Sequence, residues 1–460
     1  MEKLTFTEII RAVNGELVKE GKEVKYESLS TDTRTIGNSS IFIALKGSNF
    51  NGNNYAAEAS IKGARVCIVD EDVLNISDFH EDTYIVKVKD GKSALLDLAK
   101  YYRSRLSIKV VGITGSTGKT STKDLVAAVL SSRFNVFKTK GNFNNEIGLP
   151  LMIFNIDNSY DAAVLEMGMS NLGEIHRLAE VARPDIAIIT NIGVSHIEYL
   201  KSRENILKAK LEITDFFDKD SLLIVNNDND LLCNVNTNRY KLSKVGIENK
   251  DSYLKAEAVL LGENFIEFKV VEDEKTVSPK FRVNIPGKHN VLNSLLAIEC
   301  GRKLGLSFEE MIEGINNLEF TSMRLDIVKG EKFTILDDSY NASPDSVKAA
   351  LDVLCNFKSN KRIAVLGTMK ELGDKSFELH KEVGQYANRK NIDLLIVIGE
   401  YIEAFAAGFD DDSKFKSFMT NDEAFEYVKS ILQDEDAILI KASRSMKFET
   451  IVNKLKMINC

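Results

Sequence analysis

Short apolar runs alternate with amphipathic segments along most of the chain, a pattern that is typical of α/β proteins. Candidates for buried strands in the middle of the chain are Lys109–Thr114, Ala162–Glu166, Asp185–Thr190 and Ser221–Asn226. Because helical segments separate these runs, we predict a doubly wound parallel sheet with helices on its faces. The pattern changes over 253–285, which predicts an antiparallel flap, and an apolar helix is expected over 290–304.

The same alternation returns near the end of the chain and predicts a second, smaller Rossmann-like domain. Its expected strands are Phe333–Leu336, Arg362–Leu366, Leu394–Ile398 and Ala437–Ile440. Its expected helices are Asp345–Asn356, Lys375–Asn388, Glu423–Leu432 and Met446–Lys456.

The first part of the chain follows a different pattern. Short apolar segments at 40–45, 64–69 and 84–88 alternate with turns rich in Gly and Asn, which predicts a small α+β domain. An amphipathic helix over 92–106 is expected to lead from it into the central strands. For a chain of 460 residues we therefore predict three domains, with boundaries 1–90, 91–318 and 319–460.

Composition and charge argue against several classes of protein. The net charge is −8 with acidic and basic residues mixed along the chain, which argues against a nucleic-acid surface. The five cysteines are scattered without a paired spacing, as expected of a reducing compartment with no disulfide framework or zinc site. The start of the chain is not a signal peptide, and no apolar run approaches the length of a membrane span. We expect a cytoplasmic enzyme.

The clearest chemical signal is the segment Gly112–Thr120, which reads Gly-Ile-Thr-Gly-Ser-Thr-Gly-Lys-Thr. It follows the apolar run 108–111 and precedes helical spacing over 121–131, so a strand, a glycine turn and a helix N-terminus form a phosphate site. Ile113 stands where a standard P-loop has glycine, so this is a variant loop. The expected binding residues are Gly115, Ser116, Thr117, Gly118, Lys119, Thr120 and Ser121. Among them, Lys119 would reach the terminal phosphates and the Thr120 hydroxyl would hold Mg²⁺.

Polar residues follow the next two predicted strands at the same edge of the sheet. Glu166 ends one strand and is either a Mg²⁺ ligand or a solvated strand end. His196 follows the other, as a metal ligand or a polar cap. A helix is expected over 203–217, and spacing alone singles out neither Lys208 nor Lys210 on it.

Further polar segments are candidates for binding loops or for ordinary turns and caps. The Asn-rich loop 139–150 and the segment 287–293 are of this kind, and the latter could cap a helix or contact a base. Asp337–Pro344 follows the first strand of the third region, and Arg324 stands just before that strand, where it could neutralise a phosphate.

These motifs in this order resemble the Mur ligase superfamily, the ATP-dependent amide-forming enzymes of peptidoglycan assembly. The resemblance extends over essentially the whole chain. Its marks are Gly112–Thr120, Glu166, Thr190–His196, Lys210, His289–Asn293 and Arg324. Within the superfamily, the chain looks like the members that add D-alanyl-D-alanine to UDP-N-acetylmuramoyl-tripeptide. That likeness rests on Thr31–Arg34 with Ile41–Gly47, on Gly141–Gly148, on Asp337–Pro344, and on Met369–Gly373 with His380. Ser343, Ala442 and the stretch Asn51–Tyr55 depart from the family pattern.

The resemblance implies a mechanism and a set of site residues. ATP would lie between the second and third domains, and the tripeptide carboxylate would become an acyl phosphate that the dipeptide amine attacks. Thr120 and Glu166 would serve one Mg²⁺, and His196 with a carbamylated Lys210 a second. The nucleotide would be contacted by Asn144, Asn145, Asn293, Arg324, Asp338 and Tyr340. The substrates would be contacted by Thr33, Arg34, Lys46 and Asn341. The resemblance also implies a monomer, and we expect domain closure about a hinge near 318–322.

Alternatives stay open at this stage. The chain could be a sister ligase that adds a single amino acid, a P-loop kinase or GTPase, or a nucleotide-binding homologue without activity. The chain has no Asn-Lys-x-Asp guanine-binding motif, which counts against a GTPase. All of the expected phosphate-binding and metal-binding residues are present, which counts against an inactive homologue. The third residue of the tripeptide is not evident from the sequence.

Overall fold

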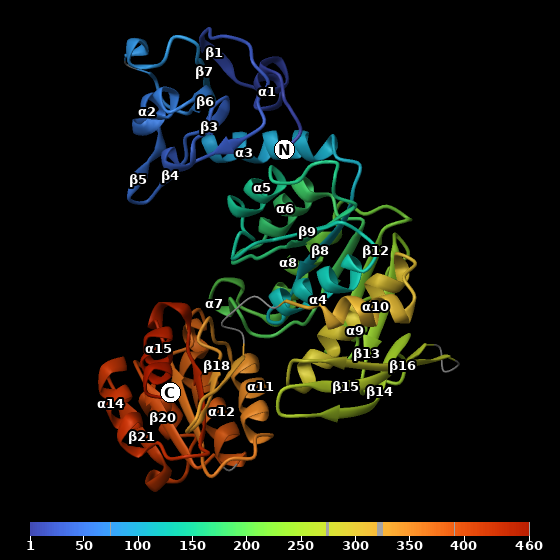
Figure 1. Cartoon of the computed structure of the whole chain (residues 1–460), viewed down its shortest axis with the longest axis vertical. Helices are drawn as coiled ribbons and strands as arrows, with labels where there is room; N and C mark the ends of the chain where they lie inside the picture. Colours follow the sequence, from blue (N-terminus) through green and yellow to red (C-terminus); the bar gives the residue numbers. More distant parts are fainter. Residues whose placement is uncertain (74, 273–275, 320–324, 391, 460) are drawn as a thin grey trace.

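A computed structural model of the chain describes residues 1–459 except 74, 273–275, 320–324 and 391. Three units follow one another along the chain, each built on its own sheet (Figure 1). We call them the N-terminal unit (1–88), the central unit (91–318) and the C-terminal unit (326–459). The first and the last lie towards opposite ends of the long axis, with the central unit between them. No helix within the described residues is long and apolar enough to cross a membrane.

The N-terminal unit is a small mixed sheet of five strands in the order β1-β7-β6-β3-β2, with a separate hairpin of β4 and β5. Its strands are β1 Glu16–Lys19, β2 Leu29–Ser30, β3 Ser40–Ile43, β4 Lys46–Gly47, β5 Phe50–Asn51, β6 Ala64–Val69 and β7 Tyr84–Lys87. Its helices are α1 Phe6–Ala12 and α2 Ala56–Ile61. The predicted apolar segments form β3, β6 and β7, which pair in parallel in the middle of the sheet.

Helix α3, Gly91–Ser104, joins this unit to the centre of the molecule. It begins at Asp90, whose carboxylate accepts a hydrogen bond from the Ser93 N–H, and the predicted apolar face is buried. It starts one residue earlier and ends two residues earlier than the predicted 92–106. Arg103 donates to the Ala182 carbonyl at 2.9 Å and Tyr102 to the Ile156 carbonyl at 2.5 Å, so the connector packs as part of the central unit.

The central sheet has nine strands in the order β16-β15-β14-β13-β12-β11-β8-β10-β9. They are β8 Lys109–Thr114, β9 Val136–Lys138, β10 Ala162–Glu166, β11 Ile186–Ile189, β12 Leu222–Asn226, β13 Lys241–Gly246, β14 Leu254–Leu261, β15 Ile266–Glu272 and β16 Thr276–Val283. The four predicted strands are parallel, and the predicted flap is the antiparallel set β14–β16. Because β8 lies between β10 and β11, the carboxyl ends of these three strands meet at one edge of the sheet.

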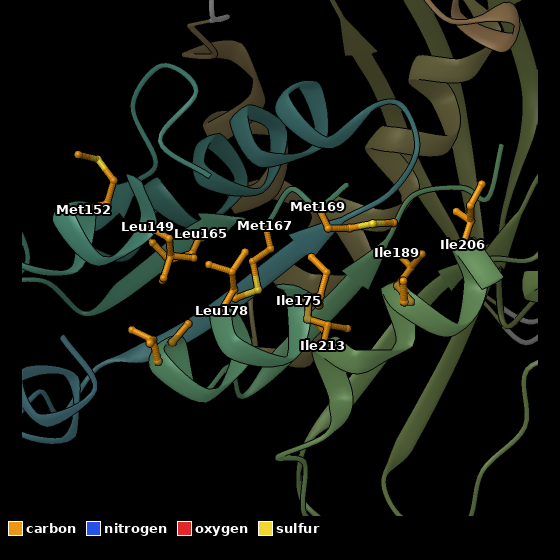
Figure 2. Packing of buried hydrophobic residues seen from close by; sticks show 14 of the residues in the cluster. Leu149, Met152, Leu165, Met167, Met169, Ile175, Leu178, Ile189, Ile206 and Ile213 are labelled. Carbon is orange, nitrogen blue, oxygen red and sulfur yellow. The ribbon is translucent and has the colours of Figure 1, made fainter. Parts of the chain in front are cut away.

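Helices cover the central sheet. They are α4 Lys119–Ser131, α5 Gly148–Ile153, α6 Glu174–Ala182, α7 Ile197–Leu200, α8 Arg203–Leu211, α9 Lys288–Lys303 and α10 Phe308–Asn316. Figure 2 shows Leu165, Ile175, Leu178 and Ile213 among the apolar side chains gathered between the sheet and the helices on one face. The predicted helix 203–217 is too long, because α8 ends at Leu211 and tightens into a 3₁₀ turn in which the Thr214 hydroxyl donates to the Leu211 carbonyl.

The C-terminal sheet has six strands in the order β17-β18-β22-β19-β20-β21, all parallel except the β17–β18 pair. The strands are β17 Asp326–Lys329, β18 Thr334–Asp337, β19 Arg362–Gly367, β20 Leu394–Ile398, β21 Phe415–Phe418 and β22 Ala437–Lys441. The helices are α11 Pro344–Cys355, α12 Ser376–Arg389, α13 Ile402–Ala406, α14 Asn421–Ile431 and α15 Glu449–Ile458. The helix predicted from Met446 begins at Glu449, because Arg444–Met446 form a 3₁₀ turn and Lys447 adopts a φ of 53°. The predicted α/β class is confirmed.

Candidate active site

The loop after β8 wraps closely because two of its glycines occupy positions that other residues could not. Gly115 has a φ of 155°, and a Cβ there would lie 1.8 Å from the Thr190 hydroxyl. Gly118 has a φ of 77°, and a Cβ there would lie 2.9 Å from the Asn293 side-chain oxygen. Helix α4 begins directly after Gly118 with no capping side chain. The backbone N–H groups and the positive dipole end of its first turn are therefore suited to an anion.

The end of β11 holds this loop in shape. The backbone carbonyl of Asn191 accepts a hydrogen bond from Ser116 N–H at 3.0 Å, and its side-chain oxygen accepts one from Thr117 N–H at 2.8 Å. Gly193 N–H donates to the Ser116 hydroxyl at 2.9 Å. Asn191 was not singled out from the sequence, although it lies within the segment 190–196 that was.

Thr120 and Glu166 come together at the edge of the sheet, as the sequence predicts. The Thr120 hydroxyl donates to one oxygen of the Glu166 carboxylate at 2.9 Å, and the Asn144 amide donates to the other at 2.8 Å. Thr120 and Glu166 are buried. A carboxylate and a hydroxyl are oxygen donors of the kind that Mg²⁺ prefers, and phosphate oxygens would complete the coordination.

Lys208 and Lys210, which helical spacing alone did not distinguish, differ in how exposed their side chains are. Lys208 is exposed, whereas Lys210 is buried, with only 2% of its surface exposed. Burial and the nearby Lys119 lower the pKa of Lys210 well below its usual value. The structure shows no carboxylate within ion-pair distance of Lys210 in the part of the chain that it describes. Lys119 itself donates to the Gly115 carbonyl at 2.9 Å.

His196 faces the C-terminal unit. It precedes α7 with a φ of 64°, and its Nδ1 lies 2.5 Å from Oε2 of Glu371, which belongs to the loop after β19. The His196 side chain holds the pKa of the Glu371 carboxyl below its usual value. The sequence marked 369–373 as a motif without indicating this contact.

A cavity of about 580 Å³ lies between the central and C-terminal units. The central unit contributes the phosphate loop residues 116–121, Thr190, Asn191, His196, His289, Asn290 and Asn293. The C-terminal unit contributes Asp338, Asn341, Asp345, Glu371, Lys441 and Arg444, among others. No residue of the described N-terminal unit lines this cavity. The loop after β8 therefore faces a second, separately folded wall.

The C-terminal wall is organised by Lys441, which the sequence analysis did not single out. Its side chain is buried, and its Nζ lies 2.5 Å from Oδ2 of Asp338 and donates to the Asn341 carbonyl at 2.8 Å. It also lies close enough to His289 to add to the effect of burial, which lowers the pKa of that imidazole to about 4. The Tyr340 ring lies 5.8 Å from the Arg444 guanidinium and is not among the lining residues.

Several expected nucleotide residues lie elsewhere or have other partners. Asn144 is bound to Glu166, and Asn145 accepts hydrogen bonds from its own turn at Ile147 and Gly148, so neither lines the cavity. Asn293 does line it, and its amide donates to the Asn290 side chain at 2.9 Å. Arg324 lies outside the described residues.

The expected substrate residues of the N-terminal unit are engaged in local contacts. Lys46 lies 3.0 Å from the carboxylates of both Asp70 and Glu71. Arg34 pairs with Asp32 at 2.6 Å on an exposed surface, and the Thr33 hydroxyl donates to Glu58 at 3.2 Å. The groups of this unit are therefore separate from the cavity in this arrangement of the chain.

No cluster of three or more His, Cys, Asp or Glu side chains that could hold a metal occurs among the described residues. A cation at Thr120 and Glu166 would therefore depend on oxygen ligands from a bound substrate. This dependence is common for Mg²⁺ in phosphoryl transfer, where substrate phosphates complete a site made of one or two protein groups.

Comparison with known proteins agrees with this architecture. Residues 113–301 match the family model of the Mur ligase middle domain, and residues 323–444 match that of the Mur ligase glutamate ligase domain. The chain is 38% identical to a UDP-N-acetylmuramoyl-tripeptide--D-alanyl-D-alanine ligase of Bacillus subtilis, with 99% of both chains covered. A crystal structure of MurF from Acinetobacter baumannii superposes with a TM-score of 0.90 at 27% identity, again with 99% of both chains covered. MurF ligase from Thermotoga maritima in complex with ADP superposes with a TM-score of 0.83 at 27% identity and covers 94% of this chain and 97% of its own.

Proposed function

The chain belongs to the Mur ligase family, and we propose that it joins D-alanyl-D-alanine to UDP-N-acetylmuramoyl-tripeptide at the expense of ATP. Full-length similarity to ligases of this name supports the assignment. The structural observation that carries it is one cavity in which the phosphate loop around Lys119 faces Asp338 and Asn341 of the C-terminal unit. Two substrates that must react with each other need a site that holds both in the right orientation, and a cavity between two units can do this.

The reaction follows from the chemistry of amide formation. A carboxylate is a poor acylating agent at neutral pH, so the tripeptide carboxylate first attacks the γ-phosphorus of ATP and ADP leaves. The resulting acyl phosphate is attacked by the free amine of D-alanyl-D-alanine, and the tetrahedral intermediate expels phosphate as the amide forms. In the first step two anions approach each other, and Lys119 with the N-terminus of α4 would offset their repulsion.

The side chains of Thr120 and Glu166 fit a magnesium ion, because a hydroxyl and a carboxylate lie 2.9 Å apart in a buried position beside the phosphate loop. When bound there, Mg²⁺ would neutralise charge on the phosphate oxygens. The protein's own contribution is to hold the Glu166 carboxylate, which Asn144 and Thr120 orient from its two oxygens. This position favours a supporting role for Asn144 over the contact with the nucleotide that the family resemblance implies.

Lys210 is proposed to act as a carbamate. Its amine is buried and its pKa is lowered, so the neutral form that reacts with carbon dioxide is accessible. Addition of carbon dioxide to the neutral amine, with release of one proton, converts a buried cation into an anion. That anion and His196 would then hold a second cation, which a lysine itself could not.

The remaining assignments concern substrate contacts and motion. We propose that Asn293, Asp338, Tyr340 and Arg324 contact the nucleotide, that Asn341 contacts the dipeptide, and that Thr33, Arg34 and Lys46 contact the uridine substrate. Because the cavity is lined by the central and C-terminal units, closure of one on the other about the proposed hinge near 318–322 would complete the site. Residues 320–322 of that hinge lie outside the described part of the chain. We propose that the enzyme acts as a cytoplasmic monomer, where ATP and nucleotide sugars are available to it.

The deciding experiment measures phosphate release from ATP with UDP-N-acetylmuramoyl-tripeptide, with lysine or diaminopimelate as its third residue. D-alanyl-D-alanine and single amino acids are offered in turn, and the product is identified by mass. Release that requires the dipeptide and gives a pentapeptide product is the expected result. Release with a single amino acid and a shorter acceptor would indicate a sister ligase, and ATP binding without release would indicate an inactive homologue.

A further inference from the structure

The loop 369–373 of the C-terminal unit is held rigidly by groups behind it. The buried His380 accepts a hydrogen bond from Met369 N–H at 2.9 Å through Nε2, and its Nδ1 donates to the Ser376 carbonyl at 2.6 Å. The Lys370 N–H donates to the Ser443 hydroxyl at 2.9 Å. These contacts fix the backbone on either side of Glu371 and present that residue to the central unit.

Glu371 contacts the central unit through two of its groups. Its backbone carbonyl accepts a hydrogen bond from Glu198 N–H in the first turn of α7 at 3.2 Å. Its carboxylate lies 2.5 Å from Nδ1 of His196, the residue immediately before α7. Gly373 lies against the same turn, since a Cβ there would come within 3.1 Å of the Glu198 side chain.

Both members of the His196–Glu371 contact have strained backbones. Each has a φ of 64°, in the left-handed region that residues with a side chain seldom adopt. Such a conformation is strained and persists where the surroundings impose it, often at functional sites. Here the strained residues meet each other, one from each unit.

The chemistry of the contact determines which nitrogen of His196 is available. A carboxylate beside Nδ1 favours the tautomer with the proton on Nδ1, which leaves the lone pair of Nε2 free. Among the described residues, Nδ1 has no hydrogen-bond partner that would compete with Glu371. Histidines that bind metal ions commonly have a carboxylate in this position, which orients the ring.

We propose that Glu371 is a positioning residue that orients His196 and selects its Nε2-available tautomer, so that the C-terminal unit completes the His196 end of the active site. This role of Glu371 depends on the proposed function only for the identity of the reaction that His196 serves. It also assigns a role to the motif 369–373 with His380: the buried histidine shapes the loop, and the loop brings the carboxylate to the other unit.

The first test observes the tautomer and needs no turnover. Two-bond ¹H–¹⁵N correlation spectra of the full-length protein labelled with [¹⁵N]histidine report the protonated nitrogen, and the signal that disappears in His196→Asn is that of His196. We expect an Nδ1–H tautomer in the native chain and its loss in Glu371→Gln. Glu400→Gln, which removes an exposed carboxylate paired with Lys370 in the same unit, should leave the spectrum of His196 unchanged. An identical His196 signal in native protein and Glu371→Gln would overturn the proposal.

The second test separates positioning from general damage. We expect Glu371→Gln to lower kcat about 10- to 100-fold, as is usual for carboxylates behind a ligating histidine, with KM for D-alanyl-D-alanine changed less than about twofold. Glu371→Asp should retain part of the native kcat. The control Glu400→Gln should have the native kcat. If the tautomer is unchanged while the Mg²⁺ concentration for half-maximal activity rises, Glu371 is itself a ligand and the positioning role is wrong. If the native chain ligates no dipeptide, the proposed function fails, and the spectra still decide the role of Glu371.

Discussion

The Thr120 hydroxyl lies 2.9 Å from the Glu166 carboxylate, although 46 residues separate them along the chain. The contact exists because β8 and β10 are neighbours in parallel register, with Glu166 opposite Ile113. The helix that follows the phosphate loop then brings Thr120 over the end of β10. Two oxygen donors thus meet beside the glycine loop that follows β8.

Glu166→Gln should abolish most of the activity while leaving the fold intact. The amide keeps the size of the side chain but removes the negative charge proposed to hold Mg²⁺, so we expect kcat to fall by about 100-fold or more. The measurement is phosphate release across a Mg²⁺ titration, with thermal unfolding as the check on folding. Glu180→Gln, which removes a partner of Lys100 on the surface, is the matched control. If the two variants have the same kcat and the same dependence on Mg²⁺ concentration, the assignment of Glu166 as a metal ligand is wrong.

Lys119→Ala should weaken both turnover and nucleotide binding. The ammonium group is expected to neutralise terminal phosphate charge as the two anions approach, so we expect kcat to fall at least about 100-fold. Phosphate release and calorimetric titration with ATP measure the two effects. If turnover and ATP affinity both stay at the native values, the phosphate loop has been assigned incorrectly.

Lys210→Met should lose activity without losing stability. Burial of an ammonium group is costly, and its lowered pKa shows that burial opposes the charged form, so an apolar side chain of similar length should be neutral or stabilising. We expect kcat to fall at least about 100-fold, since the proposed carbamate cannot form. The exposed Lys208→Met is the control and should remain within about twofold of native activity. Loss of activity in both variants to the same degree would point to damage of α8.

His380 should make the stability depend on pH. Burial lowers the pKa of its imidazole from 6.5 to about 4, so the folded state favours the neutral ring. The stabilisation is complete above pH 6.5 and is lost as pH falls towards 4, with a loss of about 2 kcal/mol at pH 5. Denaturant unfolding of native protein and His380→Gln at pH 8 and pH 5 measures the effect. The advantage of the native protein should shrink at pH 5, and an advantage that is equal at both values would contradict this account.

Local signals in the chain predicted much of the structure. Apolar periodicity located the four central strands and the C-terminal strands, because burial on both faces of a parallel sheet selects continuous apolar runs. Short edge elements such as β17 and β21 were not predicted, because strands of four residues with partly exposed side chains carry little periodicity. Helix ends were misplaced where a 3₁₀ turn intervened, as after Leu211 and before Glu449.

The sequence by itself determined the α/β class, the glycine loop between a strand and a helix, and the strand that ends at Glu166, since each depends on residues that are close together in the chain. Only the tertiary structure separated Lys210 from Lys208, because burial of a side chain depends on which elements pack over its helix. Only the tertiary structure brought Lys441 to Asp338 and Glu371 to His196. Those pairs join residues from distant segments, and the order and register of strands that place them follow from packing across the whole chain.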